Sequence, residues 1–286
     1  MSPGNGHPYS WSAIFNGYDV DAMRECEFPA IPEYLAKEKY PDSFLGDLAE
    51  VTHIWTQDSS LSMKIAKASK IAHVCGELEE MIPEVDAVLL ARDDASNHPE
   101  MARPFLNAGL PIFIDKPFAL SLKDANGMLA DQQYETQIFS CSSLLFAEEF
   151  SADKLKFKAS EVIEVEAFTP KYWDTYAAHI IDPSFNILGD WTEIIDHEKK
   201  VDDETHQLRV TKKSGRRFSF TATRGRASNI EIKLKTRNEE QSLIFKDSFK
   251  AFKSSLEMFV KQIRSKKLII ERNQSLNVVE CIELGS

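Results

Sequence analysis

The residues most able to do chemistry in the first half of the chain are Asp115-Lys116-Pro117. They follow the apolar run 111–114, which is typical of a buried strand, and the carboxyl ends of parallel strands are where ligands bind in open α/β sheets. A lysine there can hold a hydroxyl or carbonyl oxygen and shift its pKa by proximity of charge. Pro117 would fix the turn. A surface lysine paired with Asp115 is the alternative.

A second group lies in residues 173–182, Trp-Asp-Thr-Tyr-Ala-Ala-His-Ile-Ile-Asp. Helical spacing places Thr175, His179 and Asp182 on neighbouring turns of one face. Histidine is the side chain best suited to proton transfer near neutral pH. His179 is therefore a candidate acid or base, and a core histidine is the alternative. We expect Asp174, Asp182 or water to orient it, because Thr175 cannot ionise.

A third group, Gly4-Asn5-Gly6-His7, precedes a predicted helix over 10–15. Glycines before a helix let backbone amides approach a pyrophosphate at the positive helix end. Tyr9 stands where a third small residue is expected, and an ordinary glycine-rich loop remains an alternative. The strand that should precede this turn is missing, because Met1-Ser2-Pro3 is too short and contains proline.

Asp58 follows the predicted strand 51–56. A carboxylate at this place can bind the ribose hydroxyls of NAD and repel the extra phosphate of NADP. It can equally cap the helix that begins beside Ser59. No Arg or Lys lies between Trp55 and Met63 to hold a 2′-phosphate, so NAD is expected and NADP is less favoured.

The elements that must position these groups change character along the chain. In the first half, strands at 51–56, 70–74, 86–91, 111–114 and 137–141 alternate with helices at 59–69, 77–82, 97–107 and after Ser121, which predicts a parallel sheet flanked by helices. The second half has strands at 161–169, 206–211, 216–223, 229–235 and 241–245, and helices at 173–188, 249–263 and 275–284. It predicts an open, mostly antiparallel sheet. We expect a Rossmann-type domain at 1–145 and an α+β domain at 146–286.

Composition limits the partners. With 45 acidic and 34 basic residues the net charge is −11, which disfavours nucleic acid. The local cluster Lys212, Lys213, Arg216 and Arg217 is interpreted as a solvated hairpin tip. The cysteines Cys26, Cys75, Cys141 and Cys281 form no CxxC pair, which predicts neither a zinc site nor a disulfide. No apolar run reaches the ~18 residues of a membrane span, and a cytoplasmic protein without membrane contact is expected.

Taken in order, these features resemble the Gfo/Idh/MocA family of NAD(P)-dependent oxidoreductases. The stretch VDAVLLARDDASNHPEMARPFLNAGLPIFIDKPFALSLKDANGML is similar to the family's strand, helix, strand and Glu-Lys-Pro segment, with Asp115 replacing Glu. TYAAHIID resembles its Asp-x-Gly-x-His-x-x-Asp stretch, with Thr175 and Ala177 in place of Asp and Gly. FKAFKSSLEMFVKQIRSKKLIIERNQSLNVVECIEL is similar to its closing helix, turn and helix. Residues 19–48 form a longer link than the family has.

The resemblance implies that Lys116 and His179 are catalytic and flank the substrate carbon that faces the nicotinamide. It implies a homodimer or homotetramer built through the C-terminal sheet. It also implies a sugar, polyol or related small molecule as substrate, contacted by Lys116, Trp173, Thr175, Tyr176 and His179. For NAD it implies the set Gly4, Gly6, His7, Asp58, Arg92, Asp94, His98, Asp115 and Lys116.

Three features depart from the family pattern: the missing first strand, Thr175, and Ser142-Ser143-Leu144-Leu145-Phe146 where the family often has an arginine. The sequence thus predicts hydride transfer between NAD(P) and a hydroxyl or carbonyl carbon. The alternative is a non-catalytic NAD(P)-binding sensor or partner-binding protein on the same fold.

Overall fold

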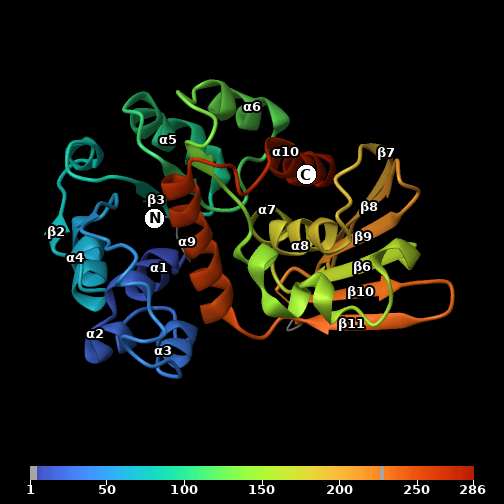
Figure 1. The fold of residues 1–286 in the computed structure, drawn as a ribbon, viewed down its shortest axis with the longest axis horizontal. Helices are drawn as coiled ribbons and strands as arrows, with labels where there is room; N and C mark the ends of the chain where they lie inside the picture. Colours follow the sequence, from blue (N-terminus) through green and yellow to red (C-terminus); the bar gives the residue numbers. More distant parts are fainter. Residues whose placement is uncertain (1–4, 226–228) are drawn as a thin grey trace. The chain divides into compact units, whose positions relative to one another are not determined.

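The structure is a computed structural model that describes residues 5–225 and 229–286. The chain divides into two compact units, each discontinuous in sequence (Figure 1). The first comprises the described part of Met1–Asp115 with Met128–Phe139 and Ser248–Ile269, and the second comprises Lys116–Gly127, Ser140–Asp247 and Ile270–Ser286. Asp115 and Lys116, neighbours in the chain, thus belong to different units.

The first unit contains two separate parallel sheets. β1 (His53–Ile54) pairs with β2 (His73–Val74), while β3 (Val88–Leu90), β4 (Ile112–Ile114) and β5 (Ile138–Phe139) form the order β3-β4-β5. The sequence predicted these strands. Its prediction that no strand precedes the first helix falls on Met1-Ser2-Pro3, which lie outside the described residues. The described residues Asn5 and Gly6 lead directly into α1 (His7–Asn16).

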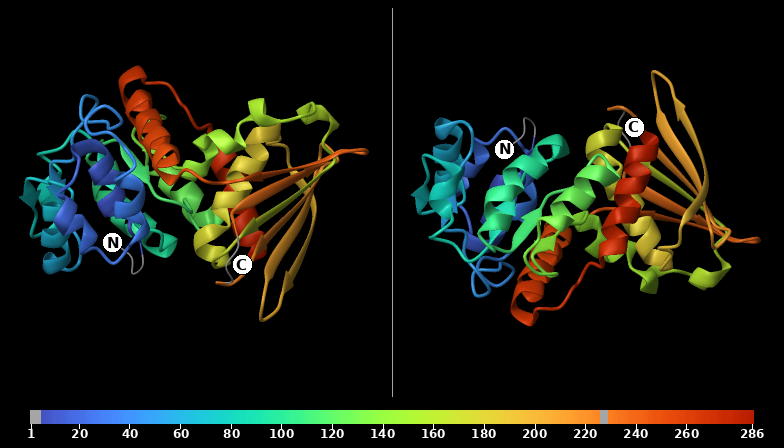
Figure 2. Two further views of the ribbon diagram at one scale, coloured as in Figure 1. Left: turned by 90° about the horizontal axis from the view of Figure 1, so that it is seen from below. Right: turned by 90° about the horizontal axis from the view of Figure 1, so that it is seen from above.

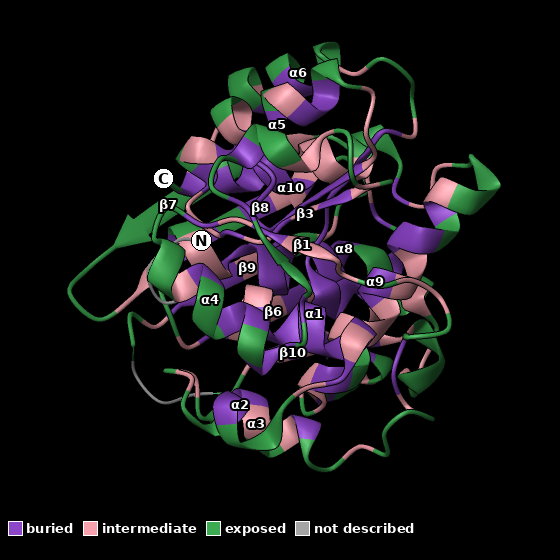
Figure 3. Ribbon diagram, turned by 90° about the vertical axis from the view of Figure 1, so that its left-hand side faces the viewer, coloured by how far each residue is buried: buried purple, intermediate pink, exposed green. Residues whose placement is uncertain are grey.

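Helices surround these sheets. Besides α1 they are α2 (Val20–Arg24), α3 (Ala30–Leu35), α4 (Ser59–Ala68), α5 (His98–Asn107) and α9 (Ser248–Ser265). Short 3-10 turns lie at Leu78–Met81 and Ala95–Asn97. The residues of α6 (Leu122–Ala130) are divided between the two units. α1 is buried along most of its length (Figure 3). α9 comes from the far end of the chain, and its Phe259 packs against Phe113 and Phe139 at centroid distances of 5.6 and 5.8 Å.

The second unit is built on one six-stranded sheet of order β11-β10-β6-β9-β8-β7. The strands are β6 (Glu164–Thr169), β7 (Ile194–Val201), β8 (His206–Lys212), β9 (Arg217–Ala222), β10 (Glu231–Lys235) and β11 (Glu240–Ile244). Only β6 and β9 pair in parallel, so the predicted, mostly antiparallel sheet is confirmed. β7 was not predicted. It is an edge strand whose residues are nearly all exposed, so it carries no apolar alternation.

Helices cover one face of this sheet. α8 (Ala178–Leu188) and α10 (Arg272–Gly285) lie on the same side of the sheet (Figure 2). α8 is preceded by α7 (Trp173–Tyr176), which is a single turn. Between helix and sheet, Phe185 meets Phe218 and Phe220 edge-on at 4.9 and 5.7 Å. Short 3-10 turns lie at Ser143–Phe146, Glu148–Phe150, Ala152–Lys154 and Ala159–Glu161. The turn Ser143–Phe146 and α8 together position the polar residues of the candidate active site.

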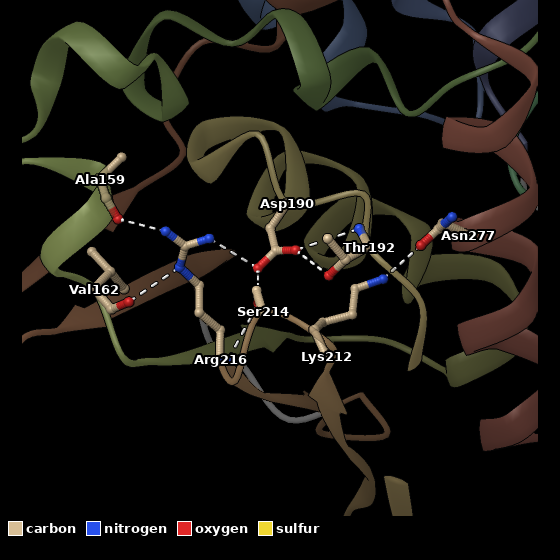
Figure 4. A network of polar contacts seen from close by, with 8 residues as sticks. All are labelled: Ala159, Val162, Asp190, Thr192, Lys212, Ser214, Arg216 and Asn277. Atoms are coloured by element: carbon tan, nitrogen blue, oxygen red, sulfur yellow. Dashed lines mark hydrogen bonds and ion pairs between the residues drawn. The ribbon is translucent and has the colours of Figure 1, made fainter. Parts of the chain in front are cut away.

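The basic cluster at the β8–β9 turn is not a solvated hairpin tip, and that interpretation is wrong. Lys212 is fully buried, with Nζ 2.5 Å from Asn277 Oδ1, and burial lowers its pKa. Arg216 pairs with the buried carboxylate of Asp190 at 2.9 Å (Figure 4). Only Lys213 and Arg217 of the four point into solvent.

Two further findings bear on the sequence predictions. Cys26, Cys75, Cys141 and Cys281 are free thiols. Among the described residues, no helix is both long and apolar enough to pass through a bilayer.

Candidate active site

Lys116 is the centre of a polar group in the second unit. Its side chain is almost fully buried, and Nζ donates a hydrogen bond to the backbone oxygen of Thr175 at 3.1 Å. Nζ also lies 5.2 Å from the ring centroid of Tyr176. The ammonium is thus held against α7 by a carbonyl and an aromatic face, which orient it. The alternative of a surface lysine is excluded by its burial.

Tyr176 joins Lys116 to His179. The Tyr176 and His179 rings meet edge-on at a centroid distance of 5.0 Å. On the other side, Lys171 places its Nζ 4.4 Å from the same Tyr176 ring. The exposed Lys171 adds a second cation to the group, one that the sequence analysis did not single out.

His179 is oriented by a serine that the sequence analysis placed only as a departure from the family pattern. His179 Nδ1 lies 2.8 Å from the Ser142 hydroxyl, and both residues are buried. The same hydroxyl accepts from the backbone N–H of Leu144 at 3.2 Å. Ser142 lies three residues after β5, so its position near the carboxyl end of a parallel strand was the available signal.

Asp182 supports this arrangement from the next turn of α8. Its Oδ2 accepts from the backbone N–H of Ser142 at 2.8 Å. Complete burial raises the pKa of Asp182 to about 7, with the Ser142 hydrogen bond opposing that shift. Thr175 contributes its backbone to Lys116, and Asp182 is linked to His179 through Ser142.

Trp173 and Asp174 are not part of this group. Trp173 is buried, donates from Nε1 to the backbone oxygen of Ile282 at 3.1 Å and stacks on His206 at 4.8 Å. A β carbon at Gly285 would lie 2.1 Å from the Trp173 ring, so glycine is needed there for α10 to pass. Trp173 therefore packs α7 against α10, and Asp174 is exposed.

In the first unit, Asp115 holds the residues ahead of α1. The carboxylate is buried, accepts from Asn5 Nδ2 at 3.1 Å and lies 2.6 Å from His7 Nδ1. The His7 ring stacks on Trp11 at 4.8 Å. Asp115 therefore fixes the start of α1 to the end of β4. Gly4 lies outside the described residues.

Arg92, Asp94 and His98 form a local network after β3. Arg92 makes a two-pronged pair with Asp94 at 2.6 and 2.5 Å, and His98 Nε2 lies 2.8 Å from the backbone oxygen of Arg92. Arg92 is buried, and its Nη1 has no hydrogen-bond partner in the described part of the chain. Such an orphaned donor is costly unless a bound group accepts from it.

Asp58 is the N-cap of α4. Its Oδ1 accepts from the backbone N–H and the hydroxyl of Ser60 at 2.8 and 2.7 Å. These hydrogen bonds, that from the hydroxyl foremost, hold the pKa of the carboxylate below its ordinary value. The cap interpretation is thus confirmed. The side chain is exposed at the carboxyl end of β1, so capping and ribose binding are compatible.

The fit to a dinucleotide is partial. The ends of β1 and β3 offer a carboxylate and an orphaned guanidinium donor. At the glycine turn, a β carbon on Gly6 would lie 2.7 Å from Ile31 Cδ1 and 2.9 Å from Phe28 Cγ. The N–H of His7 already donates to Asn5 Oδ1, and Pro8 has none. In this conformation the start of α1 does not fit a pyrophosphate.

The first unit has the parallel sheets and helices of a Rossmann-like α/β fold, and comparison with known proteins agrees. Residues 34–141 match the family described as an oxidoreductase family with an NAD-binding Rossmann fold. Over these residues the chain is similar to the Gfo/Idh/MocA oxidoreductases. The match covers β1 to β5 and leaves out the glycine turn and α1.

Solved structures share the fold. A probable dehydrogenase from Thermotoga maritima superposes with TM-score 0.68 at 15% identity, covering 82% of this chain and 88% of that one. A myo-inositol 2-dehydrogenase from Lactobacillus plantarum gives 0.67 at 13%, covering 82% and 88%. A protein of gentamicin A biosynthesis in complex with NAD gives 0.69 at 12%, covering 82% and 85%. No curated protein matches the sequence at a significant level.

Proposed function

We propose that the chain is an NAD-dependent oxidoreductase that interconverts a secondary hydroxyl and a carbonyl on a sugar, a polyol or a related small molecule. The observation that carries this proposal is the buried group of Lys116, Tyr176, His179 and Ser142 in the second unit. The Lys116 ammonium and the His179 imidazole both contact the Tyr176 ring. Such a pair can move a proton on and off a substrate hydroxyl. The NAD-binding family match and the myo-inositol 2-dehydrogenase of similar fold support the cofactor and the substrate class.

The proposed roles follow from the contacts. Lys116 is held by the Thr175 carbonyl, so its ammonium can donate to a substrate oxygen and favour the alkoxide. When His179 Nδ1 carries the proton and donates to Ser142 Oγ, Nε2 is the basic nitrogen of the ring, and we assign to it the hydroxyl proton. In the reverse direction the imidazolium returns that proton. Bound NAD would supply the hydride acceptor.

The test is kinetic. Lys116→Ala and His179→Ala are compared with the unchanged protein on a panel of polyols and sugars, with formation of reduced nicotinamide as the readout. Each variant should lose about 10²–10⁴-fold in turnover, because each group acts on the reacting hydroxyl. Cofactor affinity, measured separately by calorimetry, should change little.

Lys213→Ala is the matched control, since Lys213 is an exposed lysine of the same unit. It should keep full turnover. Near-normal turnover in both Lys116→Ala and His179→Ala would place the chemistry elsewhere. A loss confined to cofactor affinity would contradict the assigned roles.

A second function is favoured by one observation: the side chains of Ile31 and Phe28 lie close over Gly6, where a pyrophosphate would have to bind. A chain that binds NAD weakly there and turns nothing over would be a sensor or a partner-binding protein on this fold. Measurable NAD binding with no turnover on any panel member would favour it over the dehydrogenase. Turnover lost on replacing His179 would exclude it.

A further inference from the structure

Lys171 lies where the two parallel strands of the second unit end. β6 and β9 pair in parallel, so their carboxyl ends lie at the same edge of the sheet. Just beyond these ends, the backbone N–H of Arg224 donates to the Lys171 oxygen at 3.2 Å, and that of Gly225 donates to the Pro170 oxygen at 2.7 Å. The backbone of Lys171 is therefore anchored at this edge, while its side chain is exposed.

The anchored lysine shares an aromatic ring with Lys116. The Nζ of Lys171 lies 4.4 Å from the Tyr176 ring centroid, and the Nζ of Lys116 lies 5.2 Å from the same centroid. The two ammonium nitrogens are therefore no more than about 10 Å apart, a separation comparable with the Debye length at physiological ionic strength. Because Lys116 is buried, salt screens the repulsion between the two charges only in part.

No carboxylate of the described residues forms an ion pair with Lys171. Other exposed lysines of the same unit do have such partners: Lys154 and Lys213 lie 2.7 and 3.1 Å from glutamate oxygens. Acidic residues outnumber basic ones in this chain by 45 to 34, so carboxylates are plentiful. An oxyanion bound beside the Tyr176 ring would be attracted by both Lys171 and Lys116 and would relieve their mutual repulsion.

Tyr176 also connects Lys171 to the residues proposed to transfer the proton. The Tyr176 ring meets the His179 ring edge-on at a centroid distance of 5.0 Å. A substrate whose hydroxyl reaches Lys116 and His179 therefore lies beside this ring, and so close to Lys171. Since Lys116 and His179 act on the reacting hydroxyl, the exposed Lys171 ammonium is left to bind a second group of the same substrate.

We propose that Lys171 determines substrate specificity, and that the substrate is a sugar or polyol carrying an oxyanion, a carboxylate or a phosphate, which the Lys171 ammonium binds. The identity of the reacting hydroxyl rests on the proposed function, whereas oxyanion binding does not. A charge-assisted hydrogen bond from Lys171 is stronger than a bond between neutral groups. The cations at this edge also attract an anionic substrate locally, against the net charge of −11 of the whole chain.

The first test measures binding without cofactor or turnover. Acetylation of the lysines by acetic anhydride is followed by peptide mass spectrometry in the unchanged chain, alone and with D-glucose, D-glucuronate, D-glucose 6-phosphate or inorganic phosphate. A bound anionic sugar should slow acetylation of Lys171 about tenfold at a concentration ten times its Kd, and D-glucose should not. Lys200 is the matched reference, because it is an exposed lysine of the same unit that forms no ion pair with a described residue.

Slower acetylation of Lys171 with an unchanged rate at Lys200 would support the proposal, and the anionic sugar that protects Lys171 identifies the oxyanion as a carboxylate or a phosphate. Equal slowing at both lysines would show non-specific screening and overturn the proposal. So would an unchanged rate with all three anions. Protection by inorganic phosphate alone would mean an adventitious ion only and would overturn it as well.

The second test is kinetic and compares Lys171→Gln, Lys171→Arg and Lys200→Gln with the unchanged protein. Its readout is the ratio of kcat/KM for an anionic sugar to kcat/KM for the neutral sugar. Lys171→Gln should lower this ratio about tenfold to hundredfold, mainly through KM, because a hydrogen bond to a charged group is lost. Lys171→Arg should restore most of the ratio, and Lys200→Gln, which removes the same charge, should leave it unchanged. An unaltered ratio in Lys171→Gln would contradict the assignment.

The two tests let oxyanion binding and the proposed oxidoreductase activity fail separately. Protection of Lys171 by an anionic sugar, with no turnover on any sugar, would keep the oxyanion site and exclude the oxidoreductase. Turnover of neutral sugars that depends on His179, with no anion protecting Lys171, would keep the oxidoreductase and exclude an anionic substrate.

Discussion

The Ser142 hydroxyl lies 2.8 Å from Nδ1 of His179, and the backbone N–H of Ser142 donates to Asp182 at the same distance. Ser142 therefore links the imidazole to a buried carboxylate. Because Ser142 Oγ also accepts from Leu144, its own proton and one lone pair remain to face the ring. Ser142 can thus donate to Nδ1 or accept from it, and in either case the hydrogen bond orients the ring.

Ser142→Ala should lower turnover roughly tenfold to hundredfold, because a buried hydrogen bond of about 1–3 kcal/mol that orients the ring is lost. The KM for substrate should change little. The pH profile of turnover should shift as well, and Ser142→Thr should restore most of the rate, which a merely structural role would not predict.

Ser140→Ala is the control for Ser142→Ala. Ser140 is also buried beside β5, and its hydroxyl has no hydrogen-bond partner among the described residues. It should leave both turnover and pH profile unchanged. Equal losses from Ser140→Ala and Ser142→Ala would show that general packing, and not the bond to His179, is responsible.

Asp182 should make the second unit less stable as pH rises. Burial raises its pKa from 3.8 to about 7, so between these values the folded protein keeps a proton that the unfolded chain releases. Stability then falls with pH across this window, by up to about 4 kcal/mol, and levels off above it. Asp182→Asn should remove this dependence, since Asn can still accept from Ser142.

The measurement is urea unfolding of both proteins at about pH 5 and about pH 8. The informative quantity is the difference between their pH slopes, because other carboxylates titrate equally in both. Parallel slopes would mean that Asp182 is ionised throughout. An Asp182→Asn protein less stable at the higher pH than the unchanged chain would contradict the sign.

Much of the site could be predicted because local patterns encode it. An apolar run marks β4, and its end marks Asp115 and Lys116, while helical spacing marks His179 and Asp182. Ser142 was not predicted as a partner of His179, because a contact across 37 residues leaves no local trace. The packing of Trp173 was not predicted either, because its hydrogen-bond partner Ile282 lies 109 residues away.

The burial of Lys212 could have been predicted from the alternation of residues along β8. Leu208, Val210 and Lys212 alternate along β8, and all three are buried on one face. The period of two predicts burial of position 212, whereas its charge and the adjacent turn suggested solvent. The predicted absence of a first strand concerns Met1-Ser2-Pro3, which lie outside the described residues.

Asp58 allows its two roles to be separated. Asp58→Ala should lose the helix cap, at a cost of about 1 kcal/mol, together with the charge. Asp58→Ser should keep the cap, since serine is an equally good N-cap, and lose only the charge. If the carboxylate repels a 2′-phosphate, the preference for NAD over NADP should fall about tenfold, or ~1.4 kcal/mol, in both variants.

Thermal unfolding and calorimetric titration of both cofactors separate these effects. Unfolding should be altered in Asp58→Ala alone. An unchanged cofactor preference in Asp58→Ser would leave capping as the only role of Asp58. Tighter NADP than NAD binding by the unchanged protein would contradict the predicted preference outright.

The Asp190 network should matter for stability because it pairs a charge that has no access to water. Asp190 accepts from Ser214 and Thr192 at 2.5 and 2.6 Å and from Arg216 at 2.9 Å (Figure 4). Although burial alone would raise it, these bonds hold the pKa of Asp190 below its ordinary value. Arg216 also donates to the backbone oxygens of Val162 and Ala159, so it ties three segments together.

Arg216→Ala should therefore cost about 3 kcal/mol in urea unfolding at neutral pH, because it leaves a buried carboxylate without its cation. The neighbouring Arg217→Ala should cost less than about 0.5 kcal/mol, since its ion pair with Glu164 is surface-exposed. The lowered pKa means that the stabilisation from Asp190 is present above the unfolded pKa of 3.8 and is lost as pH falls through the folded value. The difference in unfolding free energy between Arg216→Ala and Arg217→Ala should accordingly become smaller in acid. Equal losses of unfolding free energy at neutral pH would show that Arg216 behaves as a surface residue.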